Sequence, residues 1–180
     1  IVVDDFGGAY RATRHLAEMG SKRIAYIGGP LNLNIYKNRQ AGYLKALSDL
    51  GLNTNESLVI NNNLTREQGI DAVQKLLNLS EKPDAIFCAN DTTAQSVIFQ
   101  LIKTGYKVPD DIAVVGFSNE PFSEMVTPSI STVMQPGFLI GIKSADLLIE
   151  QILNKQKEIE FQTIVLPTDL IIRESSVRHK

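Results

Sequence analysis

Short, almost wholly apolar segments alternate along the chain with longer segments in which apolar residues recur every three or four positions. A continuous apolar run is typical of a strand buried on both faces of a parallel sheet, and the longer spacing is typical of an amphipathic helix. Glycines such as Gly20, Gly51 and Gly105 follow helical segments and can end them. The pattern predicts strands at 1–3, 24–30, 58–60, 85–89 and 112–116 and helices at 8–19, 37–50, 65–77 and 91–103.

About five strand–helix units in series predict an α/β fold with a doubly wound parallel sheet and right-handed crossovers. The texture changes after Phe117, where Pro121, Pro128 and Pro136 divide the chain into a short helix and an extended crossing segment. A long helix at 137–154 follows, with apolar residues along one side. These apolar residues are Phe138, Ile142, Ala145, Ile149 and Ile152, and extended pieces at 163–166 and 169–172 complete the pattern.

The composition is that of an ordinary globular chain: its 180 residues are 43% apolar and 21% charged, enough to bury a real core. The net charge is −2 and basic residues gather only in the 173–180 tail, so the chain has no electrostatic footprint for nucleic acid. No apolar run is long enough for a membrane span, and no signal peptide is visible. The abrupt start on a strand-like segment leads us to expect further residues upstream. Cys88 lies in an apolar run, where it fits as a small buried hydrophobe.

Residues suited to catalysis or metal binding are scarce. The chain has no G-x-S-x-G elbow, and its two histidines, His15 in a predicted helix and His179 in the tail, make poor general bases. The acidic pairs at 4–5 and 110–111 are adjacent, so their side chains point apart and suit turns or helix caps better than metal ligation. Phosphate-binding glycine motifs are also absent. We therefore expect no enzyme activity, no metal and no cofactor.

Polar side chains follow three predicted strands at the point where each strand ends. These exits are Gly28–Pro30, Ala89–Asp91 and Gly116–Asn119. In open α/β sheets ligands bind outside the carboxyl ends of the strands, because the loops splay apart where the strand order reverses. We therefore expect the three exits to converge on one crevice for a small polar molecule. Asp91 itself is expected to be the N-cap of the following helix.

Three side chains near these exits can read the hydroxyl groups of a ligand: the guanidinium of Arg39, the amide of Asn90 and the hydroxyl of Ser118. Tyr36 or Leu64 could supply the apolar wall of such a site. Each of these residues also has a purely structural alternative. Asn90 could serve as a helix cap without contacting a ligand, Ser118 could serve as a turn residue, and Tyr36 could lie on the surface. A cation in the first helical turn opposes the helix dipole, so Arg39 at that place calls for a specific reason.

A series of short motifs runs in order along essentially the whole chain. It comprises Arg23-Ile24-Ala25-Tyr26-Ile27-Gly28-Gly29-Pro30, Pro83-Asp84-Ala85-Ile86, Asn90-Asp91, Val108-Pro109-Asp110-Asp111-Ile112, Gly116-Phe117, Gln135-Pro136 and Arg173-Glu174-Ser175. This series resembles LacI/GalR-type bacterial transcription regulators. Agreement in order over the chain is much more specific than any single motif.

The resemblance implies a periplasmic-binding-protein-like effector core of two subdomains, preceded by a helix-turn-helix headpiece that reads operator DNA as a dimer. Residues 4–131 would form the carboxyl-terminal, Rossmann-like subdomain, and residues 132–162 would belong to the amino-terminal subdomain. Residues 1–3 would be a crossover strand from the latter, and residues 163–180 would return to the former. The headpiece would lie upstream. The apolar side of the helix at 137–154 would lack the sheet on which it packs, so we expect self-association.

By the same resemblance, Arg39 and Asn90 occupy positions where family members contact a sugar or nucleobase effector. Ser118 falls where many members carry an aspartate that accepts two hydrogen bonds from the ligand, so this clamp is missing here. Gln135 lies near the crossover beside the cleft. The implied function is that of an effector-sensing domain in the bacterial cytoplasm. It would bind a small polar ligand, such as a sugar or sugar derivative, and control operator binding allosterically.

The resemblance also places Phe99, Phe122 and Met125 at the surface through which relatives form homodimers, although apolar side chains at these positions could instead be core. Two other classes of protein share this fold. A solute-binding protein of a sugar transporter has the same cleft but carries a signal peptide in place of a headpiece. An enzyme on this scaffold would need a base or a metal that the sequence does not supply. The segment 116–135 and the 173–175 ending resemble the regulators.

Overall fold

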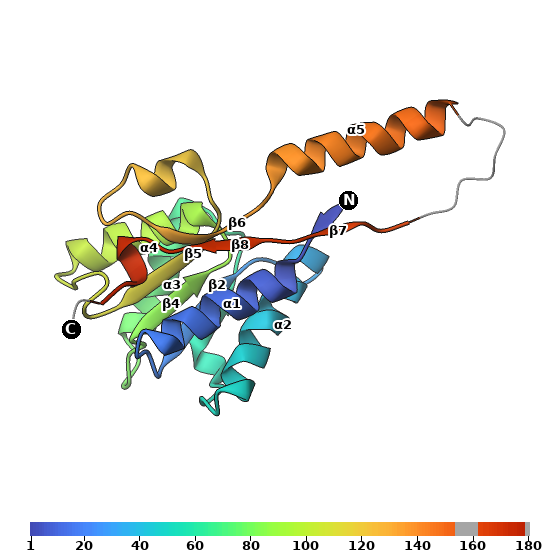
Figure 1. Ribbon diagram of the computed structural model, residues 1–180. Helices are drawn as coiled ribbons and strands as arrows, with labels where there is room; N and C mark the ends of the chain where they lie inside the picture. Colours follow the sequence, from blue (N-terminus) through green and yellow to red (C-terminus); the bar gives the residue numbers. More distant parts are fainter. Residues whose placement is uncertain (154–161, 179–180) are drawn as a thin grey trace.

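In residues 1–153 and 162–178, which the computed structural model describes, the strands form two sheets. The larger sheet has the strand order β3-β2-β4-β5-β6-β8 (Figure 1). Its strands are β2 (Ile24–Gly28), β3 (Val59–Asn61), β4 (Ala85–Cys88), β5 (Ala113–Ser118), β6 (Ser131–Met134) and β8 (Asp169–Ile171). Neighbouring strands are parallel except β6 and β8. The predicted α/β fold with a parallel sheet is therefore confirmed.

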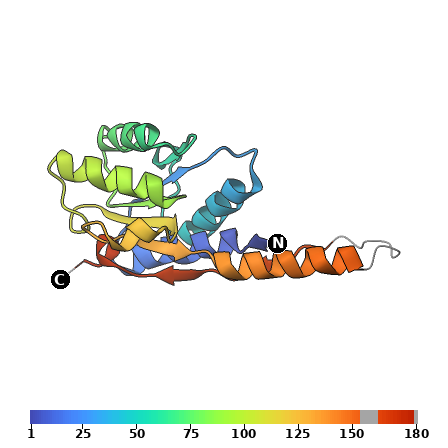
Figure 2. The same cartoon turned by 90° about the horizontal axis from the view of Figure 1, so that it is seen from above.

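Helices cover both faces of the larger sheet. They are α1 (Asp5–Glu18), α2 (Asn34–Asp49), α3 (Arg66–Leu77) and α4 (Asp91–Lys103). The pair α1 and α2 lies on one face and the pair α3 and α4 on the other (Figure 2). On the first face the ring of Tyr43 stacks on that of Tyr26, with centroids 5.1 Å apart, and both side chains are buried. The strand order reverses between β2 and β4, which is where such folds open a crevice at the carboxyl edge.

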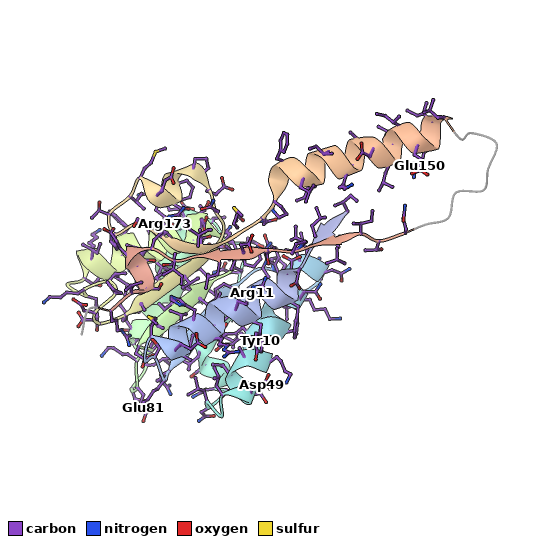
Figure 3. The ribbon with its side chains drawn as sticks, viewed as in Figure 1. Tyr10, Arg11, Asp49, Glu81, Glu150 and Arg173 are labelled. Carbon is purple, nitrogen blue, oxygen red and sulfur yellow. The ribbon has the colours of Figure 1, made fainter. Side chains whose placement is uncertain are left out.

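An arm projects from this body and consists of β1 (Val2–Val3), α5 (Gly137–Leu153) and β7 (Val165–Leu166). The strands β1 and β7 pair in parallel and form the smaller sheet. Helix α5 extends away from the body, and its side chains stand clear of the other helices (Figures 1 and 3). None of its residues is buried, and Phe138 is 86% exposed. Its apolar side therefore has no partner within the described part of the chain.

Several element boundaries differ from those that the apolar pattern predicts. Helix α1 starts at Asp5, three residues before the predicted start, because the Asp4 carboxylate accepts a hydrogen bond from the Gly7 backbone N–H at 2.8 Å. Strand β5 runs two residues past its predicted end, to Ser118. Strand β6 continues to Met134, so the chain stays in the larger sheet three residues beyond the predicted boundary at 131.

Other local predictions agree with the structure. Thr65 caps α3, since its side chain accepts a hydrogen bond from the Gln68 backbone N–H. Cys88 is fully buried. Asn154, the predicted last residue of the long helix, and His179 lie outside the described residues. Within those residues, no helix has the length and apolar character needed to cross a lipid bilayer.

Candidate functional site

A cavity of about 270 Å³ opens at the carboxyl edge of the larger sheet, and we call it the edge pocket. Two of the three predicted strand exits, those of β4 and β5, meet there, and α2 lies on its other side. The residues that line it are Ile35, Tyr36, Arg39, Asn90, Asp91, Thr92, Ser118, Glu120 and Gln135. The loops after parallel strands thus gather small polar side chains around one hollow, as the fold rule requires.

The edge pocket brings together most of the effector-binding residues predicted from the sequence. Tyr36, Arg39, Asn90, Ser118 and Gln135 all line it. They come from α2, from the ends of β4 and β5, and from the segment after β6, so residues almost one hundred positions apart share one site.

Leu64 is the predicted member that does not line the edge pocket. Its side chain is 5% exposed and belongs to the apolar core. The backbone of Leu64 has a φ of 58°, and its carbonyl accepts a hydrogen bond from the Thr93 hydroxyl at 3.3 Å. The residue therefore connects the start of α3 to α4 and offers no wall to this pocket.

Arg39 lies in the second turn of α2 because the helix begins at Asn34. The expected conflict with the helix dipole therefore does not arise. The guanidinium is 4% exposed, and its Nε donates to the Asp5 carboxylate at 2.8 Å while Nη1 donates to the Ala89 carbonyl at 2.6 Å. The Arg39 Cζ atom lies over the Phe117 ring, 3.6 Å from its centre. The buried pair fixes one side of the pocket wall, and removal of either partner would leave an unpaired charge.

Asp5 is a residue of this site that the sequence did not reveal, because its acidic neighbour made a cap or turn the simplest explanation. Asp4 does cap α1, whereas Asp5 points inward and is 5% exposed. Burial raises the pKa of Asp5, and the adjacent guanidinium of Arg39 acts against that rise. Asp5 thus holds Arg39 in place from a third element, α1.

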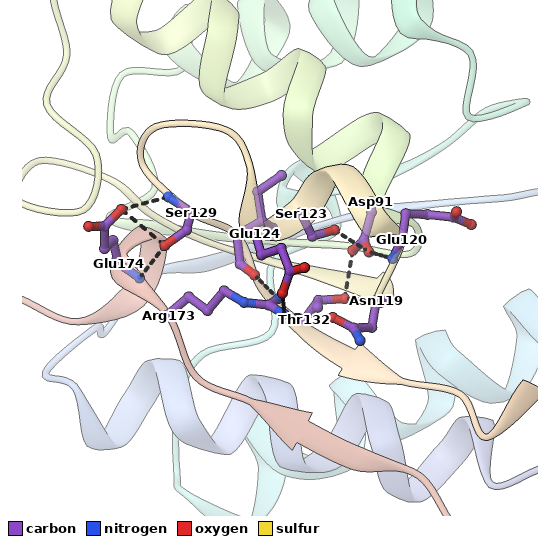
Figure 4. Close-up of polar contacts among 10 residues, drawn as sticks. Asp91, Asn119, Glu120, Ser123, Glu124, Ser129, Thr132, Arg173 and Glu174 are labelled. Carbon is purple, nitrogen blue, oxygen red and sulfur yellow. Dashed lines mark hydrogen bonds and ion pairs between the residues drawn. The ribbon is translucent and has the colours of Figure 1, made fainter.

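The structure assigns the cap of α4 to Asn90 and not to Asp91. Asn90 has an extended backbone and is the N-cap of α4, where its side chain accepts a hydrogen bond from the Thr93 backbone N–H at 2.8 Å. The prediction that Asp91 caps the helix is therefore wrong. The Asp91 carboxylate is fully buried and accepts three hydrogen bonds instead (Figure 4). Its donors are the Glu120 backbone N–H at 2.8 Å, the Ser123 hydroxyl at 2.8 Å and the Thr132 hydroxyl at 2.6 Å.

Ser118 and Asn119 form a turn with an uncommon backbone. Their φ values are 121° and 55°, in a region that residues other than glycine seldom occupy. The Ser118 hydroxyl accepts a hydrogen bond from the Gln135 side chain at 2.8 Å. Asn119 accepts one from Arg173 at 2.9 Å. Ser118 is therefore a turn residue that also lines the edge pocket.

Three lining residues were not anticipated: Ile35, Thr92 and Glu120. Glu120 changes the chemistry of the pocket most, because it is exposed and brings a carboxylate, a group that Ser118 does not supply. Its signal in the sequence was its position directly after the third strand exit. Within the described residues, no group of three or more His, Cys, Asp or Glu side chains is arranged to hold a metal ion. The pocket offers an amide, a hydroxyl, a carboxylate and a guanidinium to a small polar molecule.

A second hollow of about 500 Å³ lies between α2 and the segment before β3. Gln40, Thr54, Asn55 and Glu56 are among its lining residues. None of the residues predicted to bind a ligand lines it. The second hollow is therefore an internal control for the edge pocket.

The predicted dimer residues lie near a third, more apolar hollow of about 410 Å³ on α4 and the segment that follows the short helix Pro121–Glu124. Phe99 lines this hollow and is 47% exposed, and nearby Met125 is 75% exposed. Phe122 is half-buried and packs against the core. Two of the three side chains therefore face outward.

Comparisons with known proteins agree with this geometry. Residues 13–176 match the family described as periplasmic binding protein-like domain. The NTD biosynthesis operon regulator NtdR of Bacillus subtilis is 36% identical over 173 residues, which is 96% of this chain and 52% of that protein. The HTH-type transcriptional repressor PurR of Haemophilus influenzae is 34% identical over 177 residues, 97% of this chain and 53% of that protein. The chain thus spans about half the length of these curated relatives, whose names describe regulators and not enzymes.

Solved structures give the same result. A transcriptional regulator CelR in complex with cellobiose has a TM-score of 0.89 and 35% identity, covering 96% of this chain and 52% of that one. A LacI family transcriptional regulator from Enterococcus faecium with bound ribose has a TM-score of 0.84 and 28% identity, covering 99% of this chain and 65% of that one.

Proposed function

Since this chain belongs to the periplasmic binding protein-like domain family of LacI-type regulators, we propose that it senses a small polar effector for a bacterial transcription regulator. The edge pocket supports this proposal most directly. It collects five residues predicted from the sequence at the carboxyl edge of the sheet. Such concave sites with a few convergent polar groups bind small molecules.

We propose a sugar or sugar derivative as the effector. Two structurally similar regulators hold cellobiose and ribose, and the polar groups of the edge pocket suit ring hydroxyls. Ser118 supplies no carboxylate to accept paired hydrogen bonds. Glu120, two residues on, carries an exposed carboxylate at the same pocket and is our candidate for that task.

The regulatory step follows from the two-part architecture that we propose. Residues 4–134 and 167–178 would form one subdomain, while β1, α5 and β7 would belong to the other. Both changeovers differ from those expected at 131 and 163, because β6 stays in the larger sheet and β7 pairs with β1. The arm supports this division, because within the described residues β1 pairs only with β7 and no residue of α5 is buried. Effector in the cleft would favour one placement of the subdomains. Operator binding by an upstream helix-turn-helix headpiece would change with it, by about 5- to 150-fold for a typical coupling.

Dimerisation and cellular location complete the proposal. The exposed apolar side chains Phe99 and Met125, with Phe122 beside them, are our candidate homodimer surface. A protein that controls transcription in a bacterium acts in the cytoplasm, and we propose that location for it.

The deciding experiment is calorimetric titration of the protein with a panel of sugars that includes ribose and cellobiose. Asn90→Ser is the informative variant, because serine keeps an N-cap oxygen for α4 but removes the amide N–H donors. Asn55→Ser is the matched control, since Asn55 also caps a short helix through its side chain but lines the second hollow.

We expect wild-type binding, loss of affinity in Asn90→Ser and unchanged affinity in Asn55→Ser. Affinity that falls only in Asn55→Ser would place the ligand in the second hollow and contradict the proposed site. Absence of binding to every sugar of the panel would contradict the proposed ligand class.

A further inference from the structure

The residues of the Ser118–Asn119 turn do not fully explain its shape, because asparagine adopts a positive φ fairly often but serine does not. Both φ values are positive, which glycine tolerates and which serine adopts reluctantly. Such conformations persist only where the surrounding structure holds them, and they gather at ligand clamps. The turn also carries Ser118 and leads to Glu120, two lining residues of the edge pocket.

Asp91 holds the turn from the α4 side. Its carboxylate accepts the backbone N–H of Glu120 directly after the turn, and it accepts the hydroxyl of Thr132 at 2.6 Å. That same hydroxyl oxygen accepts a hydrogen bond from the backbone N–H of Asn119 at 3.2 Å. Thr132 therefore links the Asp91 carboxylate to the middle of the turn (Figure 4). A side chain on Gly116 would meet the Asp91 carboxylate, because an added Cβ would lie 2.1 Å from its Oδ1. Strand β5 therefore needs a glycine two residues before the turn.

Arg173 holds the turn from the opposite side. Its Nη2 donates to the side-chain oxygen of Asn119 at 2.9 Å, and its Nη1 donates to the Ile130 carbonyl at 2.8 Å. The backbone of Arg173 is itself fixed by Ser131, whose hydroxyl accepts from the Arg173 N–H at 2.7 Å and donates to its carbonyl at 2.9 Å. Arg173 follows β8, so the clamp on the turn comes from a segment more than fifty residues later in the chain.

We propose that Asp91 and Arg173 are positioning residues of the edge pocket: together they hold the Ser118–Asn119 turn in the conformation that presents Ser118 and Glu120 to the effector. The Asp91 carboxylate and the Arg173 guanidinium are not free to bind ligand, because both are already hydrogen-bonded to the turn and its neighbours. The inference rests on the proposed function for its ligand. The physical gain is preorganisation, since a turn ordered before binding spends no binding free energy on becoming ordered.

Asn119→Gly separates positioning from mere stability. Glycine adopts the positive φ without strain, so the melting temperature should stay the same or rise, although the bond to Arg173 is lost. Affinity for ribose or cellobiose, whichever binds the wild type, should nevertheless fall about tenfold because the turn is no longer held. Asn119→Asp keeps an acceptor for Arg173 and should retain the affinity.

Arg173→Met cuts the same bond from the other end and should cause a similar loss. The double variant Asn119→Gly with Arg173→Met should lose little more than either single variant, as expected for residues that act through one contact. Losses that multiply, or an affinity that follows the melting temperature in every variant, would overturn the positioning role.

Amide hydrogen exchange tests the clamp without any ligand. In Arg173→Met we expect faster exchange of the Asn119 and Glu120 amides, while amides in the middle of β5 keep their protection. Unchanged protection of these two amides would overturn the inference whatever the sugars do. If the wild type binds no sugar of the panel but the exchange result holds, the proposed ligand fails and the clamp on the turn stands.

Discussion

Helices α4 and α5 have similar spacings of apolar residues but differ in burial. Helix α4 buries eight of its residues against the body, whereas α5 buries none. The difference does not lie in the helices: α4 packs on β4 and β5, which this chain supplies, while the described residues supply no sheet for α5. Amphipathic spacing thus defines a face, and only the rest of the protein decides what covers it.

The largest effect should come from the body's buried ion pair. Arg39→Met leaves the Asp5 carboxylate buried without its partner, and we expect a loss of about 3–5 kcal/mol in unfolding free energy. Urea denaturation measures it. Arg14→Met is the control, because its pair with Glu18 is exposed and its loss should be too small to measure. A similar result for both variants would contradict the structural role of Arg39.

Leucine truncation compares the two helices directly. Leu101→Ala in α4 removes a fully buried side chain and should cost about 2–5 kcal/mol. Leu148→Ala in α5 removes a side chain that is 58% exposed and should change stability by less than about 0.5 kcal/mol in dilute solution. Equal losses in the two variants would mean that α5 is packed in solution.

Self-association tests what the arm does when it is left uncovered. We expect the 180-residue chain to associate as its concentration rises, and Ile149→Lys with Ile152→Lys to reduce that association by charging the exposed apolar side. Light scattering gives the mass. The comparison pair is Phe99→Lys with Met125→Lys on the candidate dimer surface of the body. A wild-type chain that stays monomeric at high concentration would contradict the expectation for the arm.

The smallest effect should appear as a pH dependence. The His15 ring bonds to the Ser176 hydroxyl at 2.7 Å and ties α1 to the end of the described chain. Burial lowers the pKa of His15 below its ordinary value of 6.5, with Glu18 acting weakly against it. Because the pKa of His15 is lower in the folded state, folding favours the neutral ring. The stability that the neutral ring contributes is present above pH 6.5 and is lost as the pH falls through the pKa of the folded state. Melting temperatures of His15→Gln should fall less than those of the wild type between about pH 7 and pH 5. Equal falls in the two proteins would remove His15 as the cause.

The sequence predicts the body well because its strands and helices are set by local pattern. Continuous apolar runs locate β2 and β4 within a few residues, and the cap at Thr65 was recognisable from its type and place. The same pattern could not assign Asn90 and Asp91. Both side chains can cap a helix, and the choice depends on donors from Glu120, Ser123 and Thr132 that only the folded chain brings together.

The edge pocket shows the same division. Arg39, Asn90 and Ser118 could be predicted as pocket residues from the sequence, because strand exits converge in this kind of sheet. The roles of Asp5 and Arg173 could not be predicted. Asp5 contacts Arg39 from the first helix, and Arg173 contacts Asn119 from the last described segment. Leu64 was expected only as an apolar wall of the pocket, and its side chain lies in the core instead.

The most direct test of an effector pocket at the carboxyl edge is an amide chemical-shift map of the isotope-labelled protein, titrated with ribose and cellobiose. We expect saturable shifts at Asn90, Ser118 and Glu120 and none at Thr54 or Glu56. Shifts confined to Thr54 and Glu56 would move the ligand to the second hollow. An unchanged spectrum with every sugar tested would contradict a sugar-sensing role for the edge pocket.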